Sequence, residues 1–493
     1  MLKSSRLSLV ATAVGWMLSA CAMGPDFKAP DAPKATSYAP STSPASTGVA
    51  DAQTLQVTQA IQAQWWAAFQ SPALDALVQQ AFQANPGIEG AWAALKQAQA
   101  NVAAQQGYFF PTVQAGYSSS RTKLAANSNG STPNGLNGQG LPNIYNFQSA
   151  QLTVGYVPDV LGGNRRQVES LVAQQASQRL QLEATYITLA SNVVAAAIQE
   201  ASTRAQIEAT QALIADNESL TKILREQFKW GHVMRIDVAN QEQALAQAKQ
   251  MLPPLEKQLE QTRDLMRVLV GQTPDQDIAQ TFTLADLRLP KELPVVLPSD
   301  LVKKRPDIRS AEEQLHVASA QIGVAIAARV PQFAINGAVG GGASSLAQMF
   351  NVPGQFFSFS GNVLQTLFDG GTLKARQTAA EQAFVQAQAQ YKSTVLTAFQ
   401  NVADTLHAID ADASAFKASA DAAQAAKVIW EVTQAQEKLG YVNPQTLLAA
   451  DIGYQQALMA QAQAQANRLG DSVALFQALG GGWDDSQLQA KAP

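Results

Sequence analysis

Four short segments of the chain alternate apolar and uncharged polar residues with a period of two, which predicts β-strands. They lie near residues 112–120, 146–158, 331–340 and 355–367. One side of each segment is apolar, as at Val113, Leu152 and Phe359. Such alternation fits the half-buried strand of a soluble sheet as well as a strand of a membrane barrel. The other side carries the residues that we expect to face a water-filled lumen in the second case: Gln114, Gln151, Thr153, Gln332, Asn336 and Asn362.

Aromatic residues near the segment ends favour the membrane interpretation, because strands of membrane barrels are flanked by interfacial aromatic girdles. Four strands cannot close such a barrel, and each unpaired backbone group of an open edge in hydrocarbon costs several kcal/mol. A dimer would give eight strands with a filled interior, whereas a trimer gives twelve strands and an open lumen. We therefore expect a trimer. The aromatic residues are Tyr108, Phe109, Phe110, Tyr145, Phe147, Phe356, Phe357 and Phe368.

Two long segments, 164–230 and 372–439, contain no Gly or Pro and consist mainly of Ala, Gln, Leu and Glu, which favour helices. A helix of this length is roughly 100 Å long. Each segment is followed by a return helix, expected over 232–270 and 445–479, with Pro253 and Pro254 expected to break the first one. The sustained Leu or Ile seam of a coiled coil is missing. A hollow tube of helices is therefore favoured over a solid coiled coil.

The same order of elements occurs twice, over 72–270 and again over 299–479, which indicates an internal duplication. Pro86 and Pro111 precede Pro306 and Pro331 by 220 residues, and Gly231 precedes Gly440 by 209. The predicted layout is a signal peptide over 1–20, an acylated N-terminus and linker over 21–63, and a first repeat over 64–270. A connection over 271–298, a second repeat over 299–482 and a tail over 483–493 follow.

The N-terminus predicts export. Lys3 and Arg6 precede an apolar stretch over 7–17 that is too short to span a bilayer. The Leu-Ser-Ala-Cys sequence that ends at Cys21 resembles a bacterial lipobox, which implies lipid acylation, such as palmitate, on the only Cys of the chain. Ala22 after it favours sorting to the outer membrane. Removal of residues 1–20 takes away two positive charges and moves the formal net charge from −4 to −6, which argues against a nucleic-acid partner.

Several motifs, in their order along the whole mature chain, resemble the outer membrane factors (TolC/OprM-like) of tripartite efflux systems, in particular the NodT-type lipoproteins. The resemblance implies a mixed membrane α/β fold: a trimeric outer-membrane β-barrel of twelve strands continued by a long periplasmic α-helical barrel. It also implies an equatorial belt near residues 60–70, 271–300 and the C-terminal tail. The motifs lie at 21–27, 66–69, 159–165, 305–312, 322–325, 368–371 and 478–483.

The same resemblance implies a passive channel for transport across the outer membrane, linked to antibiotic resistance. A periplasmic adaptor and an inner-membrane, proton-driven pump would be its partners. The expected cargo is small amphiphilic compounds. The channel of a one-step (type I) protein secretion system remains an alternative, and a structural periplasmic lipoprotein or adhesin is another.

In this family the periplasmic tip, where the paired helices turn, closes the tunnel. Many relatives carry an acid directly after a Thr-Leu-Leu run, but Ala449 stands there in this chain. The expected gate therefore consists of residues around that position and the neighbouring turn: Gln445, Leu447, Leu448, Asp451 and Asp237. The turns would also contact the adaptor through Gly231, Val233, Gly440 and Tyr441.

The composition argues against an enzyme. The three His residues, 232, 316 and 407, lack metal-ligand spacing and form no recognisable catalytic set. The glycine run 340–342 lacks the Lys and Ser/Thr of a phosphate-binding loop. We expect no metal and no cofactor apart from the covalent lipid on Cys21.

Overall fold

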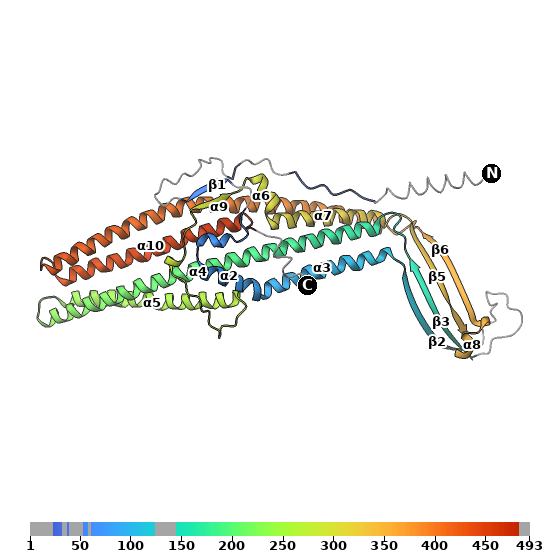
Figure 1. Cartoon of the computed structure of the whole chain (residues 1–493), viewed down its shortest axis with the longest axis horizontal. Helices are drawn as coiled ribbons and strands as arrows, with labels where there is room; N and C mark the ends of the chain where they lie inside the picture. The colour runs from blue at the N-terminus through green and yellow to red at the C-terminus, as the bar shows by residue number, and fades with distance from the viewer. Residues whose placement is uncertain (1–22, 32–36, 39–52, 58–60, 124–143, 483–493) are drawn as a thin grey trace. The chain divides into compact units, whose positions relative to one another are not determined.

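The computed structural model describes residues 23–31, 37–38, 53–57, 61–123 and 144–482 (Figure 1). The chain divides into two compact units, each built from both repeats. The first unit comprises Met1–Ala29, Lys96–Ala176 and Glu313–Ala389. The second comprises Pro30–Leu95, Ser177–Glu312 and Gln390–Pro493.

The first unit contains an antiparallel sheet of four strands in the order β2-β3-β5-β6 (Figure 1). The strands are β2 (Thr112–Lys123), β3 (Ile144–Tyr156), β5 (Gln332–Ala343) and β6 (Gln355–Leu364). They lie where the alternating pattern predicts them. The connection from β5 to β6 holds the helix α8 (Leu346–Met349) and the 3-10 turn η4 (Val352–Gly354), which the sequence pattern did not predict. Elements this short carry too few residues to show a period.

Each repeat enters its sheet from a helix that begins with proline, where a missing N–H is tolerated. These helices are α3 (Pro86–Gln106), followed by the turn η2 (Gly107–Phe109), and α7 (Pro306–Ala327). The long helices α4 (Gly163–Lys229) and α9 (Thr372–Lys438) leave the sheet.

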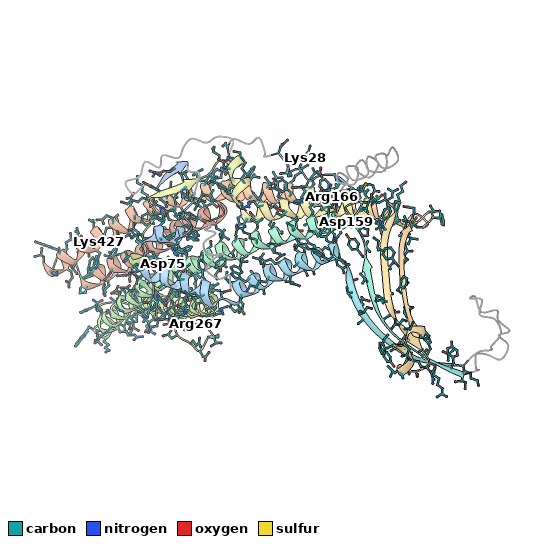
Figure 2. All side chains as sticks on the ribbon, turned by 45° about the vertical axis from the view of Figure 1, so that its right-hand side comes forward. Lys28, Asp75, Asp159, Arg166, Arg267 and Lys427 are labelled. Carbon is teal, nitrogen blue, oxygen red and sulfur yellow. The ribbon has the colours of Figure 1, made fainter. Side chains whose placement is uncertain are left out.

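An aspartate caps the start of each long helix. Asp159, labelled in Figure 2, accepts hydrogen bonds from the backbone N–H groups of Asn164 and Arg165 at 2.9 and 2.8 Å. Asp369 accepts in the same way from Gly371 and Leu373 at 2.8 and 2.7 Å. These bonds satisfy N–H groups that have no partner inside the helix. The strand-to-helix turns are therefore built alike in both repeats.

In the second unit α4 and α9 turn back into α5 (Arg235–Leu269) and α10 (Pro444–Ala478). Gly231 and Gly440 have φ of 70° and 76° at these turns, a left-handed conformation that glycine adopts without a Cβ clash. The helix bounds lie within three residues of those predicted. None of the described helices contains an apolar stretch long enough to cross a bilayer.

The predicted break at Pro253 and Pro254 is wrong, because both residues lie inside the continuous helix α5. Proline removes a backbone hydrogen bond and costs about 3 kcal/mol within a helix. Contacts with α4 on both sides of the prolines offset this loss. Gln241 donates to Asn217 at 2.9 Å before them, and Arg263 donates to Glu200 at 2.9 Å after them.

The rest of the second unit surrounds the main apolar core. It contains η1 (Trp65–Phe69), α2 (Pro72–Ala84), η3 (Leu284–Asp286) and α6 (Pro298–Lys304). Ser71 caps α2, since its hydroxyl accepts from the N–H of Leu74. Trp65, which is 2% exposed, stacks on Phe476 of α10 at 5.2 Å between ring centroids. Burial of such side chains stabilises the fold by about 1.5–3 kcal/mol each.

The acylated N-terminus and linker predicted over residues 21–63 is structured in part among its described residues. β1 (Thr54–Val57) pairs in parallel with β4 (Glu292–Val295) in the connection between the repeats. Gln53 before it is buried and donates to Ser472 of α10 at 2.9 Å. A four-residue strand is too short to be detected by alternation, and here the partner strand supplies its hydrogen bonds.

Candidate functional site

The strand register places all six predicted lumen residues on one face of the sheet. Gln114 lies opposite Thr153, Gln151 opposite Gly340, and Asn336 opposite Ser360. Asn362 lies opposite Ala334 and Gln332 opposite Leu364, on the same side. Among the described strand residues, this face, which we call the polar face, carries no charged side chain. That it lines a lumen stays a prediction.

The opposite face is apolar and exposed in the single chain. Val113 is 66% exposed, Val339 56% and Phe359 78%. The outer strands β2 and β6 each pair on one side only. An exposed apolar face of this extent requires a partner or lipid to cover it, and the open edges require further strands. A single chain therefore does not complete the sheet.

The register corrects part of the predicted aromatic girdle. Phe357 and Phe359 lie on the apolar face, whereas Tyr145, Phe147 and Phe356 lie on the polar face. Clustering near strand ends does not decide the face, because side chains alternate with a period of two.

The glycine run 340–342 makes room for neighbours on both faces of β5. A Cβ on Gly340 would lie 2.4 Å from the carbonyl oxygen of Ala150. One on Gly341 would lie 2.1 Å from the carbonyl oxygen of Met349 in α8. One on Gly342 would lie 2.9 Å from the ring of Phe147. The run therefore serves close packing of strands, helix and ring.

At the turns of the hairpins, Gln445 contacts the other hairpin. Its amide donates a hydrogen bond to Gln227 of α4. Leu447 and Leu448 are half-buried, while Ala449 is exposed. The structure therefore brings Gln445, one of the predicted gate residues of α10, into contact with α4, although closure of a tunnel there stays a prediction.

Asp451 faces α4 as well, and its neighbour is Asp216, which sequence reasoning missed. Burial and the charge of Asp451 raise the pKa of Asp216 to about 6. The Oδ2 atom of Asp216 is buried and has no hydrogen-bond partner among the described residues. Asp216 lies one helical turn after Leu213, which is buried. An acid on this apolar face of α4 was the sequence signal that could have identified it.

Asp237, the other acid predicted at the gate, binds within its own helix end. Its carboxylate accepts from the backbone N–H of Met234 at 2.9 Å and so caps α5. In the second hairpin Asn443, which lies 209 residues after Met234, caps α10 itself by accepting from the N–H of Thr446 at 2.9 Å. Among its described hydrogen bonds, Asp237 therefore shows none that joins two helices.

The turns expected to contact an adaptor expose aromatic side chains. Tyr441 is 78% exposed and Trp230 is 76% exposed, beside the turn glycines Gly440 and Gly231. Val233 is half-buried. Exposed aromatic side chains mark surfaces that bind partners. Adaptor binding at these turns stays a prediction.

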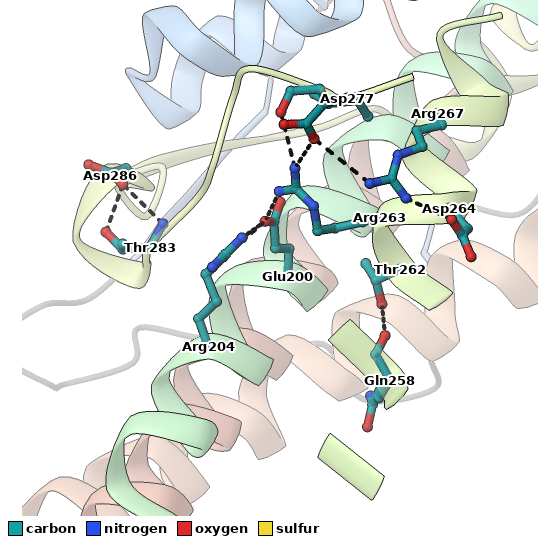
Figure 3. Close-up of polar contacts among 11 residues, drawn as sticks. Glu200, Arg204, Gln258, Thr262, Arg263, Asp264, Arg267, Asp277, Thr283 and Asp286 are labelled. Carbon is teal, nitrogen blue, oxygen red and sulfur yellow. Dashed lines mark hydrogen bonds and ion pairs between the residues drawn. The ribbon is translucent and has the colours of Figure 1, made fainter. Parts of the chain in front are cut away.

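A buried ionic network, shown in Figure 3, joins the first hairpin to the connection between the repeats. Glu200 of α4 is fully buried and accepts from Arg204 at 2.6 Å and from Arg263 of α5 at 2.9 Å. Arg263 also donates to Asp277 at 2.8 Å, and this hydrogen bond lowers the pKa of Asp277. The second repeat has Ile409 at the position equivalent to Glu200, so the two hairpins differ at this point.

Cys21 lies outside the described residues, so its acylation stays a prediction. In the part of the chain that the structure describes, no group of three or more His, Cys, Asp or Glu side chains is placed to hold a metal ion.

Comparison with known proteins identifies a family. A family model described as "Outer membrane efflux protein" matches residues 77–272 and 297–481, one range in each repeat. The chain is 28% identical over 487 residues to the antibiotic efflux pump outer membrane protein ArpC of Pseudomonas putida, covering 99% of this chain and 97% of that one. It is also 28% identical over 419 residues to the pyoverdine export outer membrane protein OpmQ of Pseudomonas putida, covering 85% and 88%.

Solved structures share the fold. The outer-membrane channel OprN matches with a TM-score of 0.80 at 24% identity, over 94% of this chain and all of the other. The CmeC outer membrane channel of Campylobacter jejuni matches with a TM-score of 0.82 at 20% identity, over 96% and 98%. The predicted fold class, that of the trimeric outer-membrane channels with a β-barrel and a long helical barrel, is confirmed.

Proposed function

The chain belongs to the outer membrane efflux protein family, and we propose that three copies of it form the passive exit duct of a tripartite efflux pump. The observation that carries the proposal is the four-stranded sheet, with one uncharged polar face, one exposed apolar face and two open edges. Three such sheets, joined edge to edge, give a closed barrel of twelve strands. Lipid then covers the apolar face and water fills the lumen.

The proposed role in efflux implies partner proteins, a lipid attachment and a class of cargo. A periplasmic adaptor binds the exposed turns at Trp230 and Tyr441, and a proton-driven inner-membrane pump supplies the energy. The acyl chains on Cys21 add a second attachment to the outer membrane. The relatives are named for antibiotics and for pyoverdine, which supports small amphiphilic compounds as the cargo class.

Dye accumulation in cells tests the proposal. Deletion of the gene should raise the accumulation of an amphiphilic dye, and the intact gene should restore the low level. A version that lacks residues 355–363, most of strand β6, should fail to restore it, because its sheet cannot close into a barrel. Unchanged dye levels with a protein lost from the secreted fraction would contradict efflux and support a secretion duct instead.

The purified chain tests the passive nature of the duct. In planar bilayers it should conduct ions without any nucleotide or partner protein. A trimer that conducts neither as the parent chain nor with Leu447→Ser and Leu448→Ser at the predicted gate would support a structural lipoprotein.

A further inference from the structure

We propose that the segment Met23–Phe27 is a docking peptide that fixes the acylated Cys21 beside the start of α4, with Arg166 as its positioning residue. The inference rests on the proposed acylation of Cys21. All contacts that carry it lie within the first unit of the chain.

Arg166 holds the segment through its whole guanidinium group. The side chain is only 5% exposed. Its Nε donates to the carbonyl oxygen of Met23 at 3.0 Å, and its Nη2 donates to the carbonyl oxygen of Gly24 at 3.3 Å. Nη2 also binds Asp26 at 2.8 Å, and Nη1 binds Glu169 at 2.7 Å. A buried guanidinium whose N–H groups bind peptide carbonyls and carboxylates is suited to hold a peptide segment in one position.

Two glycines allow the segment to approach the helices closely. Gly24 has a φ of 97°, and a Cβ on it would lie 2.5 Å from the Cα of Gly323 in α7. A Cβ on Gly323 would lie 2.7 Å from the carbonyl oxygen of Met23 and 2.8 Å from Cγ of Arg166. The backbones of the segment and of α7 are therefore in direct contact, which side chains at either position would prevent.

An aromatic contact holds the far end of the segment. Phe27 stacks on His316 of α7, with 4.3 Å between ring centroids and 10° between ring planes. The Nε2 atom of His316 lies 3.0 Å from a carboxylate oxygen of Glu169, the residue that also binds Arg166. One carboxylate thus organises both contacts. Three of the motifs that carry the family resemblance, 21–27, 159–165 and 322–325, meet at this site.

The docked segment lies at the junction between the sheet and α4, where a lipid anchor would reach the membrane surface. The backbone N–H of Met23 donates to the carbonyl oxygen of Leu161 at 3.2 Å, between the end of β3 at Tyr156 and the start of α4 at Gly163. Two residues of chain span at most roughly 7 Å, so the proposal places the acylated residue within that distance of Met23. In a sheet that spans a membrane, its end is the level of the lipid headgroups. The docked segment therefore fixes where the acyl chains enter the bilayer.

Release of the lipid by trypsin tests the docking in the full-length chain in outer membranes. The acyl group is labelled with an alkyne fatty acid. Lys34→Gln is introduced throughout, so that the exposed Lys28 is the only trypsin site between Cys21 and Lys96. A protease must draw the residues on both sides of its site into its active cleft, and the contacts of the docked segment oppose this movement. Arg166→Met and Asp26→Asn should each speed the loss of label from the chain by roughly tenfold, because each removes a charged hydrogen bond of the docked state.

Arg165→Met is the matched control. Arg165 is the neighbouring residue, its side chain is 50% exposed, and its ion pair with Asp159 is long at 3.7 Å. This variant should release label as slowly as the parent chain. The melting temperature of the trimer should stay unchanged in Asp26→Asn, whose side chain is 90% exposed, so that faster cleavage cannot come from general instability.

Equal cleavage rates in Asp26→Asn and Arg165→Met would overturn the docking proposal, even if Arg166→Met fails to reach the membrane. A parent chain without label, or a Cys21→Ser variant with label, would overturn the acylation on which it rests. Dye efflux is measured on the same cells, so a failure of the duct proposal is recognised separately.

Discussion

Asp216 of α4 and Asp451 of α10 place two carboxyl groups against each other, one from each helical hairpin. Burial, and then the charge of Asp451, raise the pKa of Asp216 from 3.8 to about 6. Because the pKa in the folded chain is raised, the contact is fully stable below pH 3.8 and loses stability as the pH rises through about 6. We therefore expect the two hairpins to be held together more tightly in acid.

This pair predicts a pH-dependent leak. In planar bilayers, the open-channel conductance of the purified trimer should rise as the pH is raised from 4 to 7. Asp216→Asn should abolish most of this rise, because the asparagine stays neutral throughout. Glu218→Gln, which removes an acid with a 53% exposed side chain two residues away, should leave the rise intact. An identical pH profile in Asp216→Asn would show that the pair does not control the tip.

The leucines after the turn of α10 give a second prediction. Leu447→Ser and Leu448→Ser should raise the leak conductance at neutral pH, because they remove half-buried apolar contacts at the predicted constriction. Ala449→Ser, at the exposed position beside them, is the control and should leave the leak unchanged. Conductance that stays the same in both leucine variants would place the constriction elsewhere.

The buried carboxylate of Glu200 gives a prediction about stability. Glu200→Gln leaves Arg263 with a weaker partner in a buried site, and the loss of a buried ion pair costs about 3–5 kcal/mol in the free energy of unfolding. Glu242→Gln, which removes a pair whose Arg225 partner is 58% exposed, should cost less than about 1 kcal/mol. Thermal dissociation of the trimer measures both. Equal melting temperatures would mean that the network adds nothing to stability.

Two glycines of the sheet should differ in how well they tolerate substitution by alanine. Gly340→Ala should disrupt the pairing of β3 with β5, because the new Cβ would lie 2.4 Å from the carbonyl oxygen of Ala150, and overpacking of this kind costs roughly 1–3 kcal/mol. Gly361→Ala in β6 meets no atom within 4 Å and should be silent. The yield of detergent-resistant trimer in outer membranes reports the difference. A normal yield of Gly340→Ala would contradict the strand register.

Neighbouring residues on β3 test which face meets lipid. Leu152→Lys places a charge on the apolar face and should reduce membrane insertion by about 2–4 kcal/mol. Gln151→Lys places the same charge on the polar face, should insert normally, and should shift the channel toward anion selectivity. Reversal potentials in a salt gradient measure the shift. Insertion losses of the same size in both variants would argue against a lumen on the polar face.

Much of the fold follows from local pattern. The strands follow from alternation at positions such as Leu152 and Thr153, and the long helices follow from stretches free of Gly and Pro. Features that depend on a distant partner are not encoded locally. Pro253 remains inside α5 because of contacts with α4, and β1 forms because β4 lies beside it.

The residues of the candidate sites also fall into two groups, those that follow from a local pattern and those that depend on a distant partner. The six polar-face residues were predictable because a single period places them together. Asp216 and Arg166 were not, because their importance comes from Asp451 and from Met23–Phe27, residues more than a hundred positions away. No rule based on spacing connects groups that meet only after folding.

The uncharged polar face also bears on how the proposed duct would select its cargo. A lumen lined by this face would carry no fixed charge along its described strand residues, so we expect it neither to attract nor to reject compounds by the sign of their charge. A transporter that acquires a new compound then needs no matching change in the sheet. We therefore expect one chain of this kind to accept the cargo of several pumps without substitutions in its sheet.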